Sequence, residues 1–151
     1  MREEKNSAYT VGLLREGQLS GAAELERLCF SEPWSEQALT LLLGENAFGV
    51  ACERDGRVVA YGGMLTVLDE GQITNIAVHP DARRQGIGRA LLTEMLRLAR
   101  ERGLSEISLE VRASNEAAIA LYERMGFAVA GRRRHFYRDP TEDALVMLLA
   151  L

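Results

Sequence analysis

One segment restricts the possible folds more than any other: a strand pattern, a loop with two glycines, and then an amphipathic helix. Residues 72–78 are typical of a strand, and residues 86–102 are typical of a helix. The apolar positions of this helix, spaced by four, four and three residues, are Ile87, Leu91, Met95 and Leu98. That spacing defines one buried helical face. The chain therefore needs a core in which a helix packs against a sheet.

The rest of the chain continues this mixture of strands and helices. Strands are predicted at 9–14, 48–53, 58–67, 72–78, 106–112, 128–134 and 144–149, and further helices at 20–29, 35–43 and 115–125. No repeat or linker interrupts them, so residues 1–151 are expected to form a single domain. The predicted fold class is α+β: a three-layer α/β/α arrangement with a mixed, largely antiparallel sheet of about seven strands.

Short signals mark several boundaries. Asp55-Gly56 is a favoured two-residue turn for a hairpin between two of the strands. Ser20 and Ser35 are predicted to cap the first two helices, because a serine hydroxyl can accept a hydrogen bond from a free amide of the first turn. Gly44 is expected to end the second of these helices.

Composition excludes several classes of protein. Of the 151 residues, 47% are hydrophobic and the net charge is −4, which argues against disorder. No apolar run approaches the roughly 18 residues of a membrane span. Residues 1–5 are charged and precede no apolar block, so we expect no signal peptide and a cytoplasmic location. The two cysteines, Cys29 and Cys52, are too few for a disulfide framework or a four-cysteine zinc site and are expected in the core.

Charge is distributed unevenly along the chain. Residues 16–70 carry ten acids against three bases, whereas residues 81–104 carry six arginines against three acids. Such an arrangement suits a protein that holds an anionic small molecule and meets a cationic partner, although charged faces can also be merely solvated. The isoelectric point near 5.3 argues against general binding of nucleic acid.

The glycine loop is the first candidate site. It reads Arg-Arg-Gln-Gly-Ile-Gly-Arg over residues 83–89, between the strand and the start of the helix. Glycines allow a ligand to approach the backbone, and the free amides and positive dipole end of a helix attract phosphate. The spacing matches neither a dinucleotide-binding fingerprint nor a P-loop, and an ordinary turn remains an alternative interpretation.

Four segments occur in a fixed order around this loop. They are Asn-Ile-Ala-Val-His-Pro at 75–80, the glycine loop at 83–89, Leu-Glu-Val-Arg-Ala-Ser-Asn at 109–115, and Ala-Ile-Ala-Leu-Tyr-Glu-Arg-Met-Gly-Phe at 118–127. Together they resemble the GCN5-related N-acetyltransferase (GNAT) superfamily. With Pro-Trp-Ser at 33–35 they resemble more narrowly its bacterial RimI-type subfamily, which acetylates the N-terminal alanine of a small-subunit ribosomal protein.

The resemblance implies acetyl-CoA as cosubstrate. In such enzymes two central strands splay apart, and the pantetheine arm of the cofactor pairs with the backbone of one of them. The residues that the resemblance assigns to the cofactor are Ile76, Ala77, Val78, Arg84, Gln85, Gly86, Ile87, Gly88, Arg89 and Asn115. Asn115 also fits a plain helix N-cap, and the two roles are compatible.

The resemblance also assigns the catalytic groups. An amine must lose a proton when it attacks a thioester directly, and the expelled thiolate must gain one. Glu110 matches the base of the family and Tyr122 matches the acid, without a covalent enzyme intermediate. By default, however, Glu110 would be a solvated carboxylate on an alternating strand and Tyr122 a core aromatic on an apolar helical stripe.

The substrate is expected to be the basic N-terminal peptide of a ribosomal protein. At neutral pH an α-amine, with a pKa near 8, is deprotonated about a hundredfold more often than a lysine, so it suits a single carboxylate base. The residues proposed to bind the peptide are Glu32, Trp34, Glu36, Arg134, His135 and Tyr137. Trp34 could instead belong to the core and Arg134 to a charged edge strand, and His135 stands where the family more often has asparagine.

Two other functions remain open from the sequence. The chain could acetylate a different amine, such as a lysine, a polyamine or an antibiotic. Alternatively, it could be a module that binds acyl-CoA without catalysing transfer. The two histidines, His79 and His135, lack the spacing of metal ligands.

Overall fold

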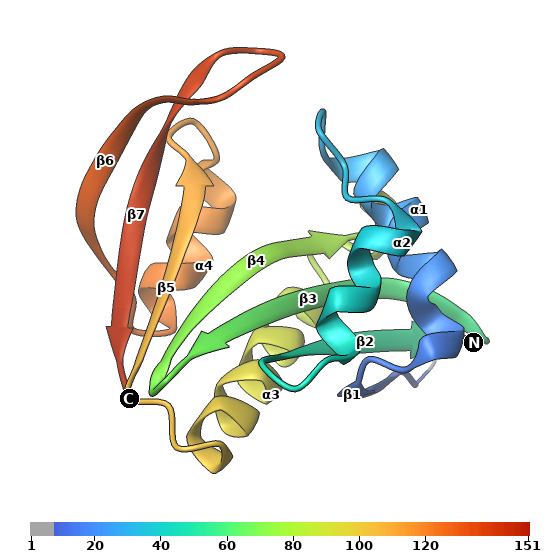
Figure 1. Ribbon diagram of the computed structural model, residues 1–151. Helices are drawn as coiled ribbons and strands as arrows, with labels where there is room; N and C mark the ends of the chain where they lie inside the picture. The colour runs from blue at the N-terminus through green and yellow to red at the C-terminus, as the bar shows by residue number, and fades with distance from the viewer. Residues whose placement is uncertain (1–7) are drawn as a thin grey trace.

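A seven-stranded mixed sheet organises the chain, and the computed structural model describes residues 8–151 (Figure 1). The strands are β1 (Thr10–Leu13), β2 (Ala47–Arg54), β3 (Arg57–Val67), β4 (Glu70–Val78), β5 (Glu106–Arg112), β6 (Ala128–Tyr137) and β7 (Glu142–Ala150). Their spatial order is β1-β2-β3-β4-β5-β7-β6. All neighbouring pairs are antiparallel except β4 and β5, which are parallel. The expectation about residues 1–5 lies outside the described residues.

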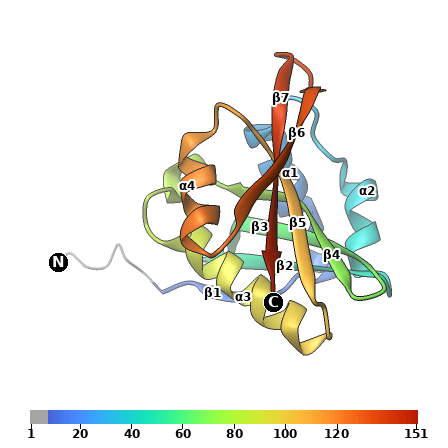
Figure 2. The ribbon, with the colours of Figure 1, turned by 90° about the vertical axis from the view of Figure 1, so that its left-hand side faces the viewer.

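Helices lie on both faces of the sheet, which confirms the three-layer prediction. They are α1 (Leu19–Cys29), α2 (Glu36–Leu39), α3 (Ile87–Glu101) and α4 (Glu116–Arg124). Helices α1 and α2 cover one face of the β1–β4 half, and α3 and α4 cover the opposite face (Figures 1 and 2). Each face has its own apolar core. The core under α3 continues across β5 and β7 to Tyr122 and Phe127, whereas the core under α1 is built around Tyr61.

The alternation predicted for β5 is observed. Ile107, Leu109 and Val111 are buried beneath the helices, whereas Glu110 and Arg112 project from the other face and are partly exposed. Because successive side chains of a strand alternate between faces, Glu110 and Arg112 share one side of the sheet. This side carries most of the polar groups described below.

Most of the short signals were correct, and one was wrong. Asp55 and Gly56 both have positive φ, at 56° and 77°, as a two-residue hairpin turn between β2 and β3 requires. Ser35 caps α2, because its hydroxyl accepts from the Ala38 amide at 3.1 Å. Ser20, in contrast, lies inside α1. A 3-10 turn at Glu16–Gln18 leads directly into that helix, so α1 begins one residue before Ser20.

The other departures concern helix length and one cysteine. The second helix is split into a short α2 and a 3-10 turn at Thr40–Leu43, and its chain leaves at Gly44 as predicted. Cys52 is fully buried, as expected, but Cys29 is only half-buried at the end of α1. Both thiols are free.

Candidate active site

The central feature of the site is the parting of the two parallel strands. Strands β4 and β5 pair only at their first residues, and the last pair is Gln72 with Ser108. Beyond that pair, β4 runs on to Val78 and β5 to Arg112 without pairing with each other, and the two ribbons diverge in Figure 1. The splayed strands predicted from the resemblance are therefore present in the structure.

The backbone of β4 offers hydrogen-bonding groups to this opening at alternate residues. His79 donates to the Val59 carbonyl at 2.8 Å, which fixes the phase of the antiparallel ladder with β3. In that phase Ala77 pairs with Tyr61, whereas the backbone groups of Ile76 and Val78 point away from β3. The methyl group of Ala77 is also buried under α1, so the backbone and the side chain of Ala77 are both engaged within the protein, and its assignment to the cofactor stays a prediction.

The carbonyl of Val78 is already engaged. It accepts hydrogen bonds from Arg83 Nε at 3.0 Å and from Cys29 Sγ at 3.6 Å. A strand-like ligand in the opening would therefore find the Val78 N–H and both backbone groups of Ile76 more accessible than the Val78 carbonyl.

A β-bulge bends β4 just before these residues. The register with β3 shifts between Gly62 and Met64, so that Thr74 and Asn75 together oppose the single residue Gly63. A side chain at Gly63 would collide with Thr74 Oγ1, so glycine is required there. The bulge turns the backbone of Asn75 and Ile76 at the point where β4 leaves β5.

A buried carboxylate that no sequence pattern predicted holds this bulge in place. Glu26, on α1, is completely buried. Its carboxylate accepts hydrogen bonds from the Asn75 amide group and the Trp34 backbone, both at 2.9 Å, and from the Tyr61 hydroxyl. Burial, with the charge of Glu26 next in size, raises the pKa of Tyr61 well above its usual value. Glu26 thereby ties α1, the loop after it, β3 and the bulge of β4 to one another.

The glycine loop forms the N-terminus of α3 as predicted. Gly86 is the N-cap residue with φ of 81°, and Arg84 also has positive φ, at 64°. The first carbonyl to accept within the helix is that of Gly86, from the Ala90 amide at 3.0 Å, which leaves the amides of Ile87, Gly88 and Arg89 without helical partners. These donors and the positive end of the helix dipole meet the physical requirements of a phosphate site.

Space beside this turn is open. A methyl group added at Gly88 would meet only Leu121, at 3.5 Å, and Val78, at 3.8 Å, which are ordinary contacts. The side chain of Gln85 is held away from the helix axis by Arg54, at 2.7 Å, and by the Asp81 carbonyl, at 3.1 Å. Arg84 and Arg89 are exposed.

Glu110 is more enclosed than a default strand carboxylate. Its side chain is 14% exposed and pairs with Arg133 Nε of β6 at 3.1 Å. Gln72 of β4 donates to its other oxygen at 3.2 Å. Because Gln72 belongs to the last paired position of β4 and β5, Glu110 lies where the two strands begin to part.

Two tyrosines belong to the same half of the molecule as this carboxylate. Tyr122, on α4, is buried and packs against Phe127, with the ring centroids 5.8 Å apart. Burial, and to a smaller degree Tyr137, raises the pKa of Tyr122 well above 10, so its hydroxyl stays protonated at neutral pH. Burial and the neighbouring charge of Glu110 raise the pKa of Tyr137 to about 12. Both hydroxyls are therefore protonated at neutral pH.

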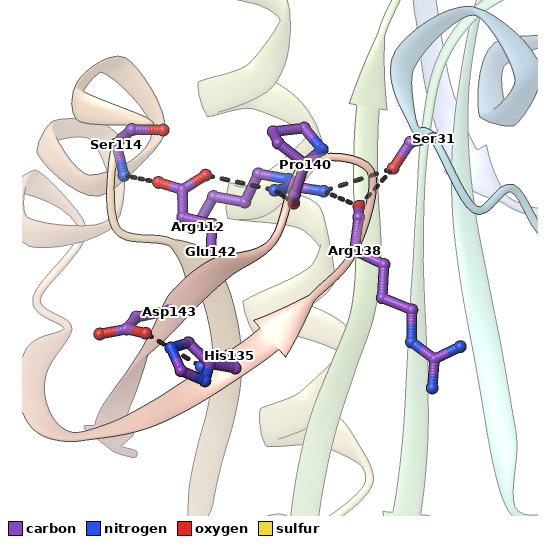
Figure 3. A network of polar contacts seen from close by, with 8 residues as sticks. All are labelled: Ser31, Arg112, Ser114, His135, Arg138, Pro140, Glu142 and Asp143. Atoms are coloured by element: carbon purple, nitrogen blue, oxygen red, sulfur yellow. Dashed lines mark hydrogen bonds and ion pairs between the residues drawn. The ribbon is translucent and has the colours of Figure 1, made fainter.

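A second unpredicted residue, Arg112, organises the loops beside these groups. Its guanidinium donates to the carbonyls of Arg138 and Pro140, at 2.8 and 2.9 Å, and to Glu142 at 3.2 Å (Figure 3). It also donates to the hydroxyl of Ser31, in the loop between α1 and α2, at 3.3 Å. The alternation of β5 predicted only that Arg112 would be on the polar face.

The residues expected to bind the peptide lie on both sides of this network. Trp34 is half-buried and packs against the core under α1, whereas Glu32 and Glu36 are exposed. Arg134 and His135 form an exposed bulge within β6 rather than a loop after it. His135 has φ of 52° there, and its amide donates to Asp143 at 2.9 Å. β6 is an edge strand, as the alternative interpretation of its arginines supposed.

Two absences concern residues 8–151 only. In that range no group of three or more histidine, cysteine, aspartate or glutamate residues is arranged to hold a metal ion. None of the helices in the same range combines the length and apolar character that crossing a bilayer would require.

Asn115 caps α4 through the Ala118 amide, at 3.2 Å, as one of its two interpretations predicted.

Comparison with known proteins identifies the family. The sequence matches the profile of the Acetyltransferase (GNAT) family over residues 19–127. This chain belongs to the GNAT acetyltransferase family. It is therefore an acetyltransferase and not a module that only binds acyl-CoA.

Several GNAT relatives are similar over nearly their whole length. The [ribosomal protein bS18]-alanine N-acetyltransferase of Escherichia coli K12 is 41% identical over 144 residues, which cover 94% of this chain and 97% of the relative. The N-alpha-acetyltransferase RimI of Mycobacterium tuberculosis is 36% identical and covers 91% and 90%. The resemblance to the RimI type is thus confirmed.

Solved GNAT structures share the fold described above. The crystal structure of the ribosomal-protein-S18-alanine N-acetyltransferase from E. coli superposes with a TM-score of 0.87, covering 95% of this chain and 94% of that one at 41% identity. Arabidopsis thaliana NAA60, solved in complex with acetyl-CoA, has a TM-score of 0.85 at 18% identity and covers 95% and 99%. At that identity the plant enzyme supports the fold alone.

Proposed function

We propose that this GNAT enzyme transfers an acetyl group from acetyl-CoA to the α-amine of an N-terminal alanine, and that its substrate is the small-subunit ribosomal protein bS18. The observation that carries the choice of substrate is the 41% identity to the E. coli bS18-alanine enzyme over 94% of this chain. A ribosomal substrate also implies that the enzyme works in the cytoplasm.

Acetyl-CoA would bind between β4 and β5. The free amides of Ile87, Gly88 and Arg89 would bind the diphosphate, and Arg84 would add positive charge. From that turn the opening leads along β4, where Ile76 and the Val78 N–H would pair with the amides of the pantetheine arm. Asn115 lies at the start of α4, and its side chain already serves as the helix cap.

Glu110 and Tyr122 would move the two protons of the reaction. As the nitrogen–carbon bond to the acetyl group forms, Glu110 accepts a proton from the amine, directly or through water. As the carbon–sulfur bond breaks, the thiolate takes a proton from the Tyr122 hydroxyl. Its raised pKa keeps Tyr122 in the protonated form that donation requires. Because the amine attacks the thioester directly, no side chain of the enzyme is acylated.

The peptide would reach Glu110 between the loop that follows α1 and the segment that joins β6 to β7. Glu32 and Glu36 on one side are exposed and suit a basic peptide, and Trp34 lies beside them. Tyr137, Arg134 and His135 lie on the other side. A single carboxylate base suits an α-amine better than a lysine, because far more of the α-amine is neutral at pH 7.

A blocking experiment tests the nature of the amine. The enzyme is incubated with acetyl-CoA and a basic peptide that begins with alanine, or with the same peptide N-terminally blocked but containing lysine, and released thiol is measured. We expect release with the free α-amine and background release with the blocked peptide. Release only with the blocked peptide would point to a lysine acetyltransferase, and background release with both peptides would point to a different amine as the acceptor.

A further inference from the structure

The opening between β4 and β5 divides the sheet into two halves that need a connection at the open end. After Gln72 and Ser108 the two strands no longer pair. Among residues 8–151, the hydrogen bonds that cross farther along are those from Arg112 to the Ser31 hydroxyl and from the Ser31 hydroxyl to the Arg138 carbonyl. Ser31 follows α1 and belongs to the β1–β4 half, whereas Arg112 and Arg138 belong to the β5–β7 half.

The planar guanidinium group of Arg112 allows this one side chain to donate to several segments at once. One terminal nitrogen donates to Pro140 and Glu142, and the other donates to Ser31 and the Arg138 carbonyl. The Ser31 hydroxyl in turn donates to the same Arg138 carbonyl at 3.0 Å, which closes a triangle of hydrogen bonds. Figure 3 shows the Arg138 side chain extending away, so only its backbone takes part. Three of the four acceptors of Arg112 are uncharged, so neutralising Glu142 cannot be the whole role of this side chain.

The same side chain contacts the groups around the proposed base. The guanidinium carbon lies 4.6 Å from the centre of the Tyr137 ring, in cation–π contact. Arg112 also shares its face of β5 with Glu110, two residues earlier. Glu142, its one charged partner, accepts from the Ser114 amide at 2.6 Å. Hydrogen bonding to Ser114, through its side chain first and its amide to a smaller degree, lowers the pKa of Glu142. Arg112 therefore joins the start of α4 to the same network.

We propose that Arg112 is a positioning residue for the peptide substrate. It fastens the loop after α1 to the segment between β6 and β7, and so fixes the two walls between which the N-terminus of the peptide reaches Glu110. It does not touch the reacting atoms. This inference rests on the proposed function, because it concerns the peptide side of the same site.

Steady-state kinetics separates this role from general stabilisation. Arg112→Met is expected to raise the KM for the alanine peptide about tenfold and to leave the KM for acetyl-CoA within about twofold. The substitution removes one hydrogen bond across the opening and the three that hold the segment between β6 and β7 and the start of β7. Arg112→Lys is expected to recover only part of the loss, because an ammonium group cannot reach acceptors in four directions. Arg97→Met is the matched control: Arg97 bonds Glu94 and Glu101 on α3, both at 2.6 Å, and should leave both KM values unchanged.

Ser31→Ala is the milder second variant and keeps the test decisive if Arg112→Met folds poorly. It removes only the bonds across the opening, so it should raise the peptide KM about twofold to fivefold with unchanged melting temperature. In both variants, amide hydrogen exchange should accelerate in residues 30–33 and 138–141, but not in the Arg97 control.

The outcomes distinguish this inference from the proposed function. A peptide KM that stays unchanged in the Arg112 and Ser31 variants, or exchange that stays as slow as in the wild type, would overturn the role of Arg112. A wild-type enzyme that ignores the alanine peptide would instead refute the substrate. In that case faster exchange in the two segments would still support the connection made by Arg112, and unchanged exchange would refute it.

Discussion

Gly88→Ala separates the binding of the diphosphate from the stability of the helix that binds it. In the free protein the added methyl group meets Leu121 at 3.5 Å and Val78 at 3.8 Å, so it fits without displacement. Gly88 lies in the first turn of α3 and its φ is not positive, so alanine should stabilise the helix by up to about 1 kcal/mol. For a chain of this length the melting temperature should then stay constant or rise by about 1–4 °C.

Binding of coenzyme A should change in the opposite direction. The diphosphate is proposed to bind the amides of this turn, where the methyl group would stand between donor and ligand. Loss of one hydrogen bond to a charged group costs about 1.5–3 kcal/mol, which corresponds to roughly a 10- to 100-fold higher Kd.

Isothermal titration calorimetry with coenzyme A and a thermal melt of the same samples measure both effects. Gly17→Ala serves as the control, because a Cβ there has open space around it and Gly17 lies in the 3-10 turn before α1. We expect the control to bind coenzyme A like the wild type. A Gly88→Ala protein that melts normally and binds with unchanged affinity would refute the proposed contact between the diphosphate and this turn.

Four further predictions follow from the site. Glu110→Gln should lower kcat/KM about 10²- to 10⁴-fold in a thiol-release assay while calorimetry shows unchanged affinity for coenzyme A, because only the base is lost. Tyr122→Phe should lower kcat by a similar factor at unchanged fold by circular dichroism, since the hydroxyl alone is removed; a wild-type rate would show that another donor protonates the thiolate. Glu26→Gln should lower the free energy of unfolding by about 1–3 kcal/mol in urea titrations, because the amide cannot accept from all three donors and one is left unpaired; equal stability would show that the network rearranges at no cost. The folded-state pKa of Glu142 is lowered, so its contribution to stability is present above the unfolded pKa of about 4.3 and is lost as the pH falls through the folded value; urea titrations near pH 6 and pH 3 should therefore show a larger loss for the wild type than for Glu142→Gln.

The sequence predicted best what neighbouring residues determine. The Asp55-Gly56 turn, the alternation of β5 and the cap at Asn115 each depend on a few consecutive residues, and the structure confirms them. The glycine loop at the start of α3 could also be predicted, because this loop and the strand before it are continuous in the chain. The separation of β4 from β5 was predicted only from the family resemblance, since no local sequence pattern indicates it.

The supports of the site depend on contacts between distant segments, and these have no local signal. Glu26 lies on an ordinary helix, yet it is buried because α1 packs over Tyr61 and Asn75, which are 35 and 49 residues away. Arg112 donates a hydrogen bond to Ser31, which is 81 residues away in the sequence. The bulge in β4 arises from its register against β3, where Gly63 leaves the space that Thr74 occupies. The start of α1 was misplaced for a simpler reason: the preceding 3-10 turn continued into the helix.

The central claim is that the acetyl group reaches an N-terminal α-amine held beside Glu110. One basic peptide with an N-terminal alanine and an internal lysine tests it most directly, because both amines then compete in the same tube. After brief incubation with the wild-type enzyme and acetyl-CoA, tandem mass spectrometry locates the added acetyl group. The account predicts a fragment series that carries the acetyl group from the first residue onward. An acetyl group found on the lysine, with the alanine unmodified, would contradict it.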